Sequence, residues 1–249
     1  HEIKHIMGLY RLWDSLLERF PHLLIDNCAS GGRRIDIETL RRSVPLWRSD
    51  YQCHANSDPE TAQTHTIAFN DWIPYSATSS GRSIGDLYRH RSAYGPGMGN
   101  SYWYSDEEPF TQSEEQLAWI RKTNEEYKRV RPYFSGDFYP LTEAALDDDG
   151  WCAYQLDRPE QKDGVVLIFK REKSPFLTAA FSLGGIAEGD TYVFTDADTG
   201  EDKMLKGAKR EHKTVMEIAR FYTDAFFDDC RKLNIKTPDV VEPATSCID

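Results

Sequence analysis

Two short segments near the N-terminus end in acidic side chains that could supply carboxylates for general acid/base chemistry. Apolar residues 23–25 lead into Asp26, and residues 44–47 lead into Asp50. Between them lie a turn built of small residues and a stretch over 35–42 with helical spacing of apolar residues. This pattern predicts a strand, helix, strand unit with an acid at the end of each strand. Parallel α/β folds place their chemistry at those strand ends.

The same stretch carries a family resemblance. It resembles the signature of glycoside hydrolase family 36, the bacterial α-galactosidases or melibiases, in the turn Cys28-Ala29-Ser30-Gly31-Gly32, in Arg34 and Asp36, and in Trp47 with Ser49-Asp50. The likeness is strong over residues 8–51 and looser over 64–170. It implies a galactosidase-type hydrolase that needs no cofactor and no metal ion.

The resemblance implies that Asp50 is the general acid/base. Retaining glycosidases need a second carboxylate as nucleophile about 5–5.5 Å away. The residues alone would suggest Asp26, which ends the neighbouring strand. In the family, however, the nucleophile lies on the strand before that one, so we expect it upstream of His1. The alternative for Asp50 is a helix cap or a surface carboxylate, since acids at strand ends are common.

Four further residues are candidates for contacts with a sugar. Cys28 and Gly31 match family positions that contact the 2-hydroxyl, one through sulfur and one through a backbone N–H. Arg48 resembles an arginine that touches the 2-position in the related family 27. Trp47 could stack on a pyranose ring, although a tryptophan at a strand end is more often part of the core. A lone cysteine such as Cys28 is also commonly a buried small hydrophobe.

The elements along the chain predict the fold class and two domains. Residues 1–136 read as an α/β array that the resemblance identifies as the C-terminal half of a (β/α)8 barrel. Residues 137–249 read as an antiparallel β-sandwich followed by a loose tail from residue 234. The pattern over 215–227 is ambiguous between strands and a helix. Strands are expected at 151–156, 164–170, 177–183 and 191–195.

Capping residues predict where three helices lie. Asp58 and Pro59 start a helix that runs to about Phe69, and Ser113 starts a long one that ends near Arg131. Residues 1–20 have apolar side chains at helical spacing, so the chain begins inside a helical pattern. The native N-terminus is therefore expected further upstream.

Composition limits the classes of partner. The chain has 249 residues and a formal net charge of -11, which disfavours nucleic acids and anionic membranes. Its 5 cysteines are odd in number and lack the spacing of metal ligands, which favours a reducing compartment. We expect a cytoplasmic protein, with export left open by the missing N-terminus. Family members often form oligomers, so a homo-oligomer is a further expectation.

The resemblance implies a retaining exo-glycoside hydrolase that removes terminal α-linked galactose, or a close galacto-configured sugar, from α-galactoside oligosaccharides. The chain itself would lack the nucleophile. The alternative, from another class, is a non-catalytic carbohydrate-binding or assembly module with the same fold.

Overall fold

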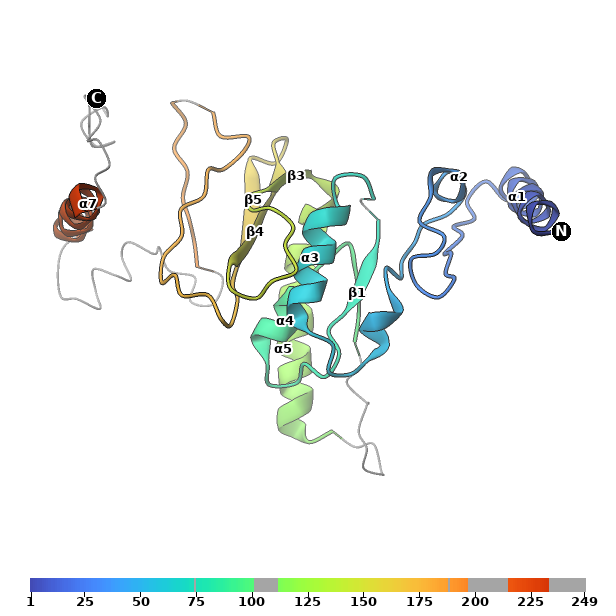
Figure 1. Cartoon of the computed structure of the whole chain (residues 1–249), viewed down its shortest axis with the longest axis horizontal. Helices are drawn as coiled ribbons and strands as arrows, with labels where there is room; N and C mark the ends of the chain where they lie inside the picture. Colours follow the sequence, from blue (N-terminus) through green and yellow to red (C-terminus); the bar gives the residue numbers. More distant parts are fainter. Residues whose placement is uncertain (74, 101–111, 188, 197–214, 233–249) are drawn as a thin grey trace. The chain divides into compact units, whose positions relative to one another are not determined.

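The computed structural model describes residues 1–73, 75–100, 112–187, 189–196 and 215–232 (Figure 1). Contacts divide the chain into two compact units, His1–Ile186 and Ala187–Asp249. The predicted division at residue 136 falls inside the first unit. The two units are defined by contacts between residues, and such units need not coincide with the domains that a sequence predicts. The division at residue 136 therefore stays a prediction.

The N-terminal helix α1 (Glu2–Arg19) is tied to the short helix α2 (Ile37–Leu40) by one arginine. The Arg42 guanidinium donates to Asp14 at 2.6 Å and lies 4.6 Å from the ring centroid of Tyr10. Most of the apolar stripe of α1 is not covered, because Trp13 is its buried residue while Ile3 is 77% exposed.

Four extended segments pair in parallel, in the order in which they occur along the chain. Asp26 pairs with Val44 and Trp47 pairs with Ala77, each through an isolated bridge. Strand β1 (Ala77–Ser79) then pairs in register with β2 (Gly97–Gly99). The parallel α/β arrangement of residues 1–100 is present, and closure into a barrel is not tested.

Helices follow these segments as the capping residues predicted. Helix α3 spans Pro59–Phe69 and helix α5 spans Glu114–Val130, with a full capping box between Ser113 and Gln116. The shorter elements of this part are α4 (Leu87–Ser92) and the 3-10 helices η1 (Asp50–Cys53) and η2 (Arg131–Ser135).

The antiparallel part of the first unit is a three-stranded sheet, β3-β4-β5. Its strands are β3 (Asp137–Pro140), β4 (Trp151–Arg158) and β5 (Asp163–Lys170). The predictions for β4 and β5 are confirmed. Those for residues 177–183 and 191–195 are wrong, because neither range forms a strand. Apolar side chains there, such as Leu177 at 87% exposed, lack a second sheet layer among the described residues.

The ambiguous C-terminal pattern is a helix. Helix α7 spans Val215–Lys232, with acidic Glu217 in its first turn and basic residues in its last, as the helix dipole favours. The loose tail predicted from residue 234 lies outside the described residues. The β-sandwich predicted for residues 137–249 therefore stays a prediction beyond the three-stranded sheet.

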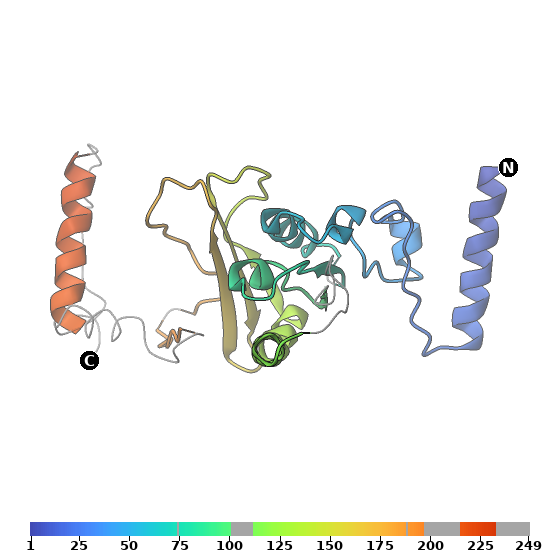
Figure 2. The ribbon, with the colours of Figure 1, turned by 90° about the horizontal axis from the view of Figure 1, so that it is seen from below.

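The hydrophobic core joins the sheet to the helices that flank the parallel strands. Figure 2 shows β4 and β5 edge-on, with α5 in yellow-green beside them. The buried members of this core come from α3, α5, η2, β4, β5 and the loop after α4: Ile67, Tyr94, Tyr127, Phe134, Cys152, Tyr154, Leu156, Leu167 and Phe169. The antiparallel sheet thus packs directly on the helical layer of the α/β part.

Arg171, directly after β5, links the two layers through polar contacts. Its side chain is 2% exposed and donates to the Gln63 and Thr64 side chains on α3, at 3.3 and 2.9 Å. It also donates to the backbone carbonyls of Ala145 and Asp147. A buried guanidinium that satisfies partners on both layers fixes the sheet against α3.

Candidate active site

The glycine turn predicted as part of the site lies against the backbone that carries Asp50. Gly31 has a φ of +71°, and a Cβ atom built on it would lie 2.6 Å from the backbone nitrogen of Asp50 and 2.7 Å from Ser49 Cα. A Cβ atom on Gly32 would lie 3.0 Å from the carbonyl oxygen of Arg48. Only residues without a side chain permit this approach. The structure therefore brings Gly31 and Asp50 together.

Asp50 begins η1 and its side chain is exposed. The turn before it is held by Ser49, whose hydroxyl accepts a hydrogen bond from the Tyr51 N–H at 3.2 Å. The Asp50 carboxylate accepts none of the hydrogen bonds found among the described side chains, and it does not cap the element that it begins. The alternative of a helix cap is therefore not supported.

Arg48 is not presented to solvent. It is 2% exposed, and it donates from Nε to the Ser76 hydroxyl at 2.8 Å and from Nη1 to the Thr66 hydroxyl at 2.9 Å. Its Nη2 atom is buried with no hydrogen-bond partner in the described residues. Burial lowers the pKa of Arg48 to about 10. This placement, beneath α3 and beside β1, does not favour the predicted contact with a sugar.

Asp26, the acid on the preceding strand, accepts a backbone hydrogen bond, unlike Asp50. The Asp26 carboxylate accepts a hydrogen bond from the Leu46 N–H at 3.2 Å, which ties its own strand to the next. The neighbouring Asn27 side chain donates to the Ser43 hydroxyl at 2.7 Å. These contacts give Asp26 and Asn27 a role in holding the two strand ends together.

Two other residues of the motif have structural contacts. Asp36 caps α2 by accepting hydrogen bonds from the Thr39 N–H at 2.9 Å and the Thr39 hydroxyl at 2.7 Å. These bonds lower the pKa of Asp36 although burial acts most strongly in the opposite direction. Arg34 donates to the carbonyl of Cys28 at 3.4 Å and so braces the turn.

The remaining predicted sugar contacts differ in exposure. Cys28 is a free cysteine on the surface, so it is not the buried hydrophobe of the alternative reading. Trp47 is half-buried, and a Cβ atom on Gly99 would lie 3.7 Å from its Cζ3 atom. The indole therefore lies over a strand without a side chain at that position. Both residues stay proposals as sugar contacts.

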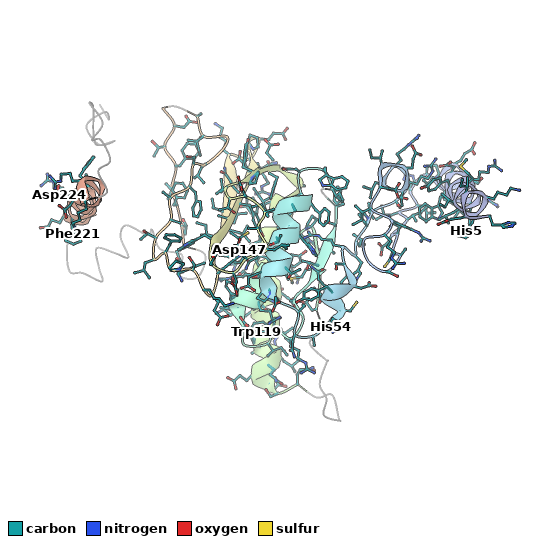
Figure 3. All side chains as sticks on the ribbon, viewed as in Figure 1. His5, His54, Trp119, Asp147, Phe221 and Asp224 are labelled. Carbon is teal, nitrogen blue, oxygen red and sulfur yellow. The ribbon has the colours of Figure 1, made fainter. Side chains whose placement is uncertain are left out.

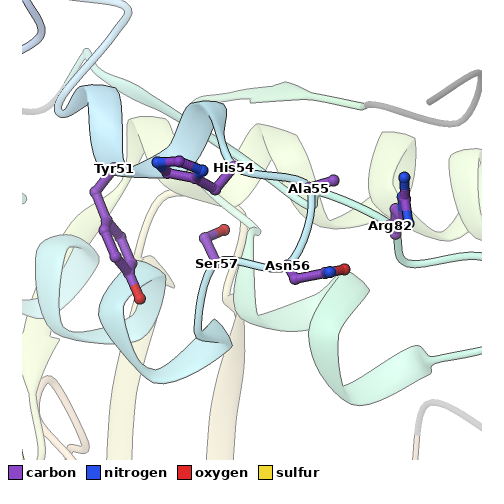
Figure 4. A pocket seen from close by; sticks show the side chains of 6 residues that line it. All are labelled: Tyr51, His54, Ala55, Asn56, Ser57 and Arg82. Atoms are coloured by element: carbon purple, nitrogen blue, oxygen red, sulfur yellow. The ribbon is translucent and has the colours of Figure 1, made fainter. Parts of the chain in front are cut away.

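A pocket opens directly after Asp50. Its volume is about 420 Å³, and it is lined by residues of the loop after the strand at 44–47 and by Arg82 from the loop after β1. Figure 3 marks His54 on the chain, and Figure 4 shows the lining side chains of Tyr51, His54, Ala55, Asn56, Ser57 and Arg82. The pocket therefore lies at the C-terminal ends of adjacent parallel segments.

A histidine that stays neutral lies near Arg48. His65 on α3 lies 3.3 Å from the Gln52 side chain through Nδ1. Burial lowers the pKa of His65 to about 4, and the charge of Arg48 acts in the same direction. At neutral pH, Arg48 therefore faces an uncharged imidazole.

Sequence reasoning missed the pocket and the burial of Arg48. Residues 51–57 have no motif of their own, and their position after a strand end was the available signal. The burial of Arg48 depends on Ser76 and Thr66, which lie 28 and 18 residues away. Polar partners at that distance cannot be recognised without the fold.

The described residues contain neither a cluster of metal ligands nor a membrane-spanning helix. No three His, Cys, Asp or Glu side chains come close enough together there to hold a metal ion. Within the same ranges, no helix combines the length and the apolar character needed to cross a bilayer.

Comparison with known proteins bears on this geometry. Residues 1–61, which contain the glycine turn and Asp50, match the family model described as Melibiase. This segment is similar to the melibiase family. The resemblance to family 36 α-galactosidases that the motif predicted is thereby confirmed, and the melibiase segment includes every residue predicted for the site.

A curated relative and two solved structures extend the likeness beyond the melibiase segment. The probable α-galactosidase G of Aspergillus terreus is 26% identical over 176 residues, which cover 67% of this chain and 23% of that protein. The galactosidase domain of an α-galactosidase–sucrose kinase shares the fold with a TM-score of 0.54, over 72% of this chain and 25% of that chain, at 22% identity. A family 36 α-galactosidase from Geobacillus stearothermophilus, solved in complex with 1-deoxygalactonojirimycin, gives 0.51 over 73% and 25%, at 22% identity.

A second, unrelated likeness was not predicted. The cysteine–tRNA ligase of Treponema denticola is 54% identical to this chain over 58 residues, and that of Borrelia hermsii is 57% identical over 53 residues. These matches cover 23% and 21% of this chain but only 12% and 11% of the ligases. The chain thus spans a small part of the length of each curated relative that it matches.

Proposed function

We propose that the first unit is the C-terminal part of a retaining exo-α-galactosidase in which Asp50 is the general acid/base. The observation that carries this proposal is the contact of the glycine turn with the Asp50 backbone, within the segment that matches melibiase. An exposed carboxylate at the C-terminal end of a parallel strand fits that role. The substrates would be oligosaccharides with terminal α-linked galactose or a close galacto-configured sugar.

The two-step reaction assigns a bond change to each group. A nucleophilic carboxylate attacks the anomeric carbon while Asp50 gives its proton to the glycosidic oxygen, so that the C–O bond breaks and the leaving alcohol departs. Asp50, now ionised, takes a proton from a water molecule as that water attacks the anomeric carbon and the bond from this carbon to the nucleophilic carboxylate breaks. The free sugar is then released, and both carboxyl groups return to their starting protonation states.

We place the nucleophile upstream of His1, because the family that the motif resembles carries it on the strand before the one that ends in Asp26. Cys28, Gly31 and Trp47 are proposed to contact the sugar. Arg48 is proposed to act behind the site, since its guanidinium is held by Ser76 and Thr66.

Hydrolysis assays test the catalytic proposal. We would compare this 249-residue chain with a version extended upstream, using p-nitrophenyl α-D-galactoside and an α-1,6-linked galactosyl-glucose disaccharide. Activity is expected only in the extended version. There, Asp50→Asn should lower the rate on the disaccharide by about 10²–10⁴-fold. With the nitrophenyl substrate, Asp50→Asn should slow the first step, in which the galactosyl group is transferred to the nucleophile, by a smaller factor. The reason is that nitrophenolate leaves without needing a proton.

The control for this assay is Asp71→Asn, an exposed acid after α3. Activity in the 249-residue chain would place the nucleophile within it, and Asp26 would be mutated first. Galactoside binding without activity in either version would support the alternative of a non-catalytic binding or assembly module.

A second candidate function concerns the end of the chain, and it rests on the likeness to cysteine–tRNA ligases. An alignment of 58 residues is short enough for Ala187–Asp249, and an alignment of 176 residues, as with α-galactosidase G, is short enough for His1–Ile186. The second unit is therefore proposed to be the ligase-like segment and to contact RNA. A segment that covers 12% of a ligase is not expected to catalyse aminoacylation.

A binding titration tests the second candidate. Labelled tRNA would be titrated with the whole chain while its fluorescence polarisation is followed. The charge reversals Arg231→Glu and Lys232→Glu on α7 should weaken binding, whereas Lys4→Glu and Arg19→Glu on α1 should not. No binding at about 100 µM protein, which is at the weak limit of non-specific association, would reject an RNA role. It would restore the expectation, based on the net charge of -11, that nucleic acids are not partners.

A further inference from the structure

Arg48 carries a buried positive charge that has only neutral partners among the described residues. Its side chain is 2% exposed, and the hydroxyls of Ser76 and Thr66 accept its hydrogen bonds from Nε and Nη1. Burial lowers the pKa of Arg48 to about 10, and no carboxylate of the described residues acts on it in the opposite direction. The guanidinium therefore stays charged at neutral pH. A buried charge is costly unless a counter-charge accompanies it.

The parallel pairing puts a further hydroxyl on the same face as Arg48. Trp47 pairs with Ala77, and side chains alternate between the two faces of an extended chain. Arg48, Ser76 and Thr78, which flank this bridge, therefore share the opposite face, where Arg48 donates to Ser76. Thr78 is 0% exposed, and its hydroxyl has no hydrogen-bond partner within the part of the chain that the structure describes.

Tyr154 on β4 brings a second such hydroxyl from the antiparallel sheet. It is 0% exposed, and its hydroxyl also lacks a hydrogen-bond partner in the described ranges. Met98, the β2 partner of Thr78, packs against the core cluster that contains Tyr154. Burial raises the pKa of Tyr154, and the charge of Arg48 acts against that rise. The phenol and the guanidinium therefore lie near one another in the same buried layer.

These groups are hydrogen-bond donors next to a positive charge. Nη2 of Arg48 is buried without a hydrogen-bond partner in the described residues. A Cβ atom on Gly95 would lie 3.2 Å from Nη2, so backbone rather than a side chain borders this side of the guanidinium. The hydroxyls of Thr78 and Tyr154 can each donate as well. Donors of this kind around an uncompensated cation match a small anion, because hydrogen bonds to a charged acceptor are the stronger ones.

We propose that Arg48, Thr78 and Tyr154 form a buried site for a small monovalent anion of the halide class, such as chloride. The anion supplies the counter-charge of the guanidinium and accepts hydrogen bonds from Nη2 and from the two hydroxyls. It links the parallel strands to β4. The site is separate from the proposed hydrolysis, because Arg48 takes part in no step of that reaction.

Urea denaturation of the whole 249-residue chain tests the site. Sodium gluconate would be replaced stepwise by sodium chloride at constant ionic strength, because gluconate is too large for an enclosed site. The urea midpoint is expected to rise with the logarithm of the chloride concentration, as it does for a ligand that binds only the folded state. Arg48→Met should lose this rise.

The matched control is Lys173→Met, which also removes one positive charge, but from a side chain that is 70% exposed. It should keep the response to chloride, and the comparison removes the general effects of salts on stability. Thr78→Val and Tyr154→Phe keep the test open if Arg48→Met does not fold. Each should weaken the apparent affinity for chloride about tenfold, as the loss of one hydrogen bond to a charged group predicts.

Crystals grown in sodium bromide would locate the anion directly. Anomalous scattering from bromide is expected within hydrogen-bond distance of Arg48 Nη2. A response to chloride that is the same in Arg48→Met as in Lys173→Met, or that survives both hydroxyl variants, would overturn the inference. So would crystals in which a water molecule, and no bromide, is bound to Nη2.

Discussion

Gly31 and Asp50 are nineteen positions apart in the sequence, yet a Cβ atom on Gly31 would lie 2.6 Å from the Asp50 backbone nitrogen. The contact sets the position of the proposed acid through the main chain rather than through a side chain. The glycine is therefore required for two reasons: the left-handed conformation, with its φ of +71°, and the lack of space for a side chain.

Gly31→Ala should be more destabilising than Gly85→Ala. Both glycines have positive φ, but nothing lies within 4 Å of a Cβ atom on Gly85. Gly85→Ala should lower the free energy of unfolding by about 1–2 kcal/mol through backbone strain alone. Gly31→Ala should exceed that value, because Ser49 and Asp50 must also move. Urea denaturation measures both, and equal losses would contradict the contact.

Arg48→Lys should destabilise the chain more than Arg48→Met. A lysine keeps a buried charge but cannot reach both Ser76 and Thr66 as the guanidinium does. Methionine removes the charge and leaves two hydroxyls with one partner fewer, at about 1–3 kcal/mol. Urea denaturation of the two variants gives the order. A larger loss for methionine would mean that the charge itself stabilises the fold.

Arg171→Met should lower the free energy of unfolding by about 3–5 kcal/mol, since it breaks a buried network. The control is Lys173→Met. Its ammonium group lies 2.6 Å from Asp148, but the side chain is 70% exposed, so the loss should be within about 1 kcal/mol. Similar losses for the two variants would show that Arg171 does not hold the layers together.

Acid should destabilise the chain below neutral pH through two histidines. Burial lowers the pKa values of His90 and His65 to about 4 each, from an ordinary 6.5. The unfolded chain therefore takes up protons at these positions below pH 6.5 while the folded chain does not. Folded stability is complete above pH 6.5 and falls as the pH drops towards 4, by up to about 1.4 kcal/mol per pH unit for each histidine.

Urea midpoints measured between pH 7.5 and 5 would show this loss. His5→Ala, which removes an exposed histidine, should leave the slope unchanged. His90→Gln should reduce it, because His90 is fully buried between the rings of Tyr94 and Trp119, at centroid distances of 5.7 and 5.3 Å. A stability that does not change over this range would contradict the neutral state of both imidazoles.

Local signals predicted the elements that depend on local chemistry. Ser113 and Pro59 placed the starts of α5 and α3 correctly, because capping involves groups within one turn. The strand predictions for residues 177–183 and 191–195 were wrong because strand formation depends on groups distant in the sequence. Their apolar residues suit a strand, but a strand also needs a neighbour with which to pair, and the described residues of these ranges show only an isolated bridge at Thr195.

The candidate site also combines features that the local sequence predicts with features that depend on distant residues. The small residues at 28–32 predicted a tight turn, and its approach to Asp50 follows from the parallel pairing of the two strands. The burial of Arg48 could not be predicted, since an arginine beside an acid at a strand end looks identical whether it faces a ligand or lies beneath a helix.

Arg171 has a consequence for how the first unit opens. Because one guanidinium binds the α3 side chains and the carbonyls of Ala145 and Asp147, the helix cannot separate from the loop before β4 one contact at a time. The amide protons of α3 and of β5 should then exchange with solvent in a single cooperative event rather than as independent local fluctuations. The α/β part and the antiparallel sheet, which look like two domains in the sequence, would thus behave as one unit of exchange.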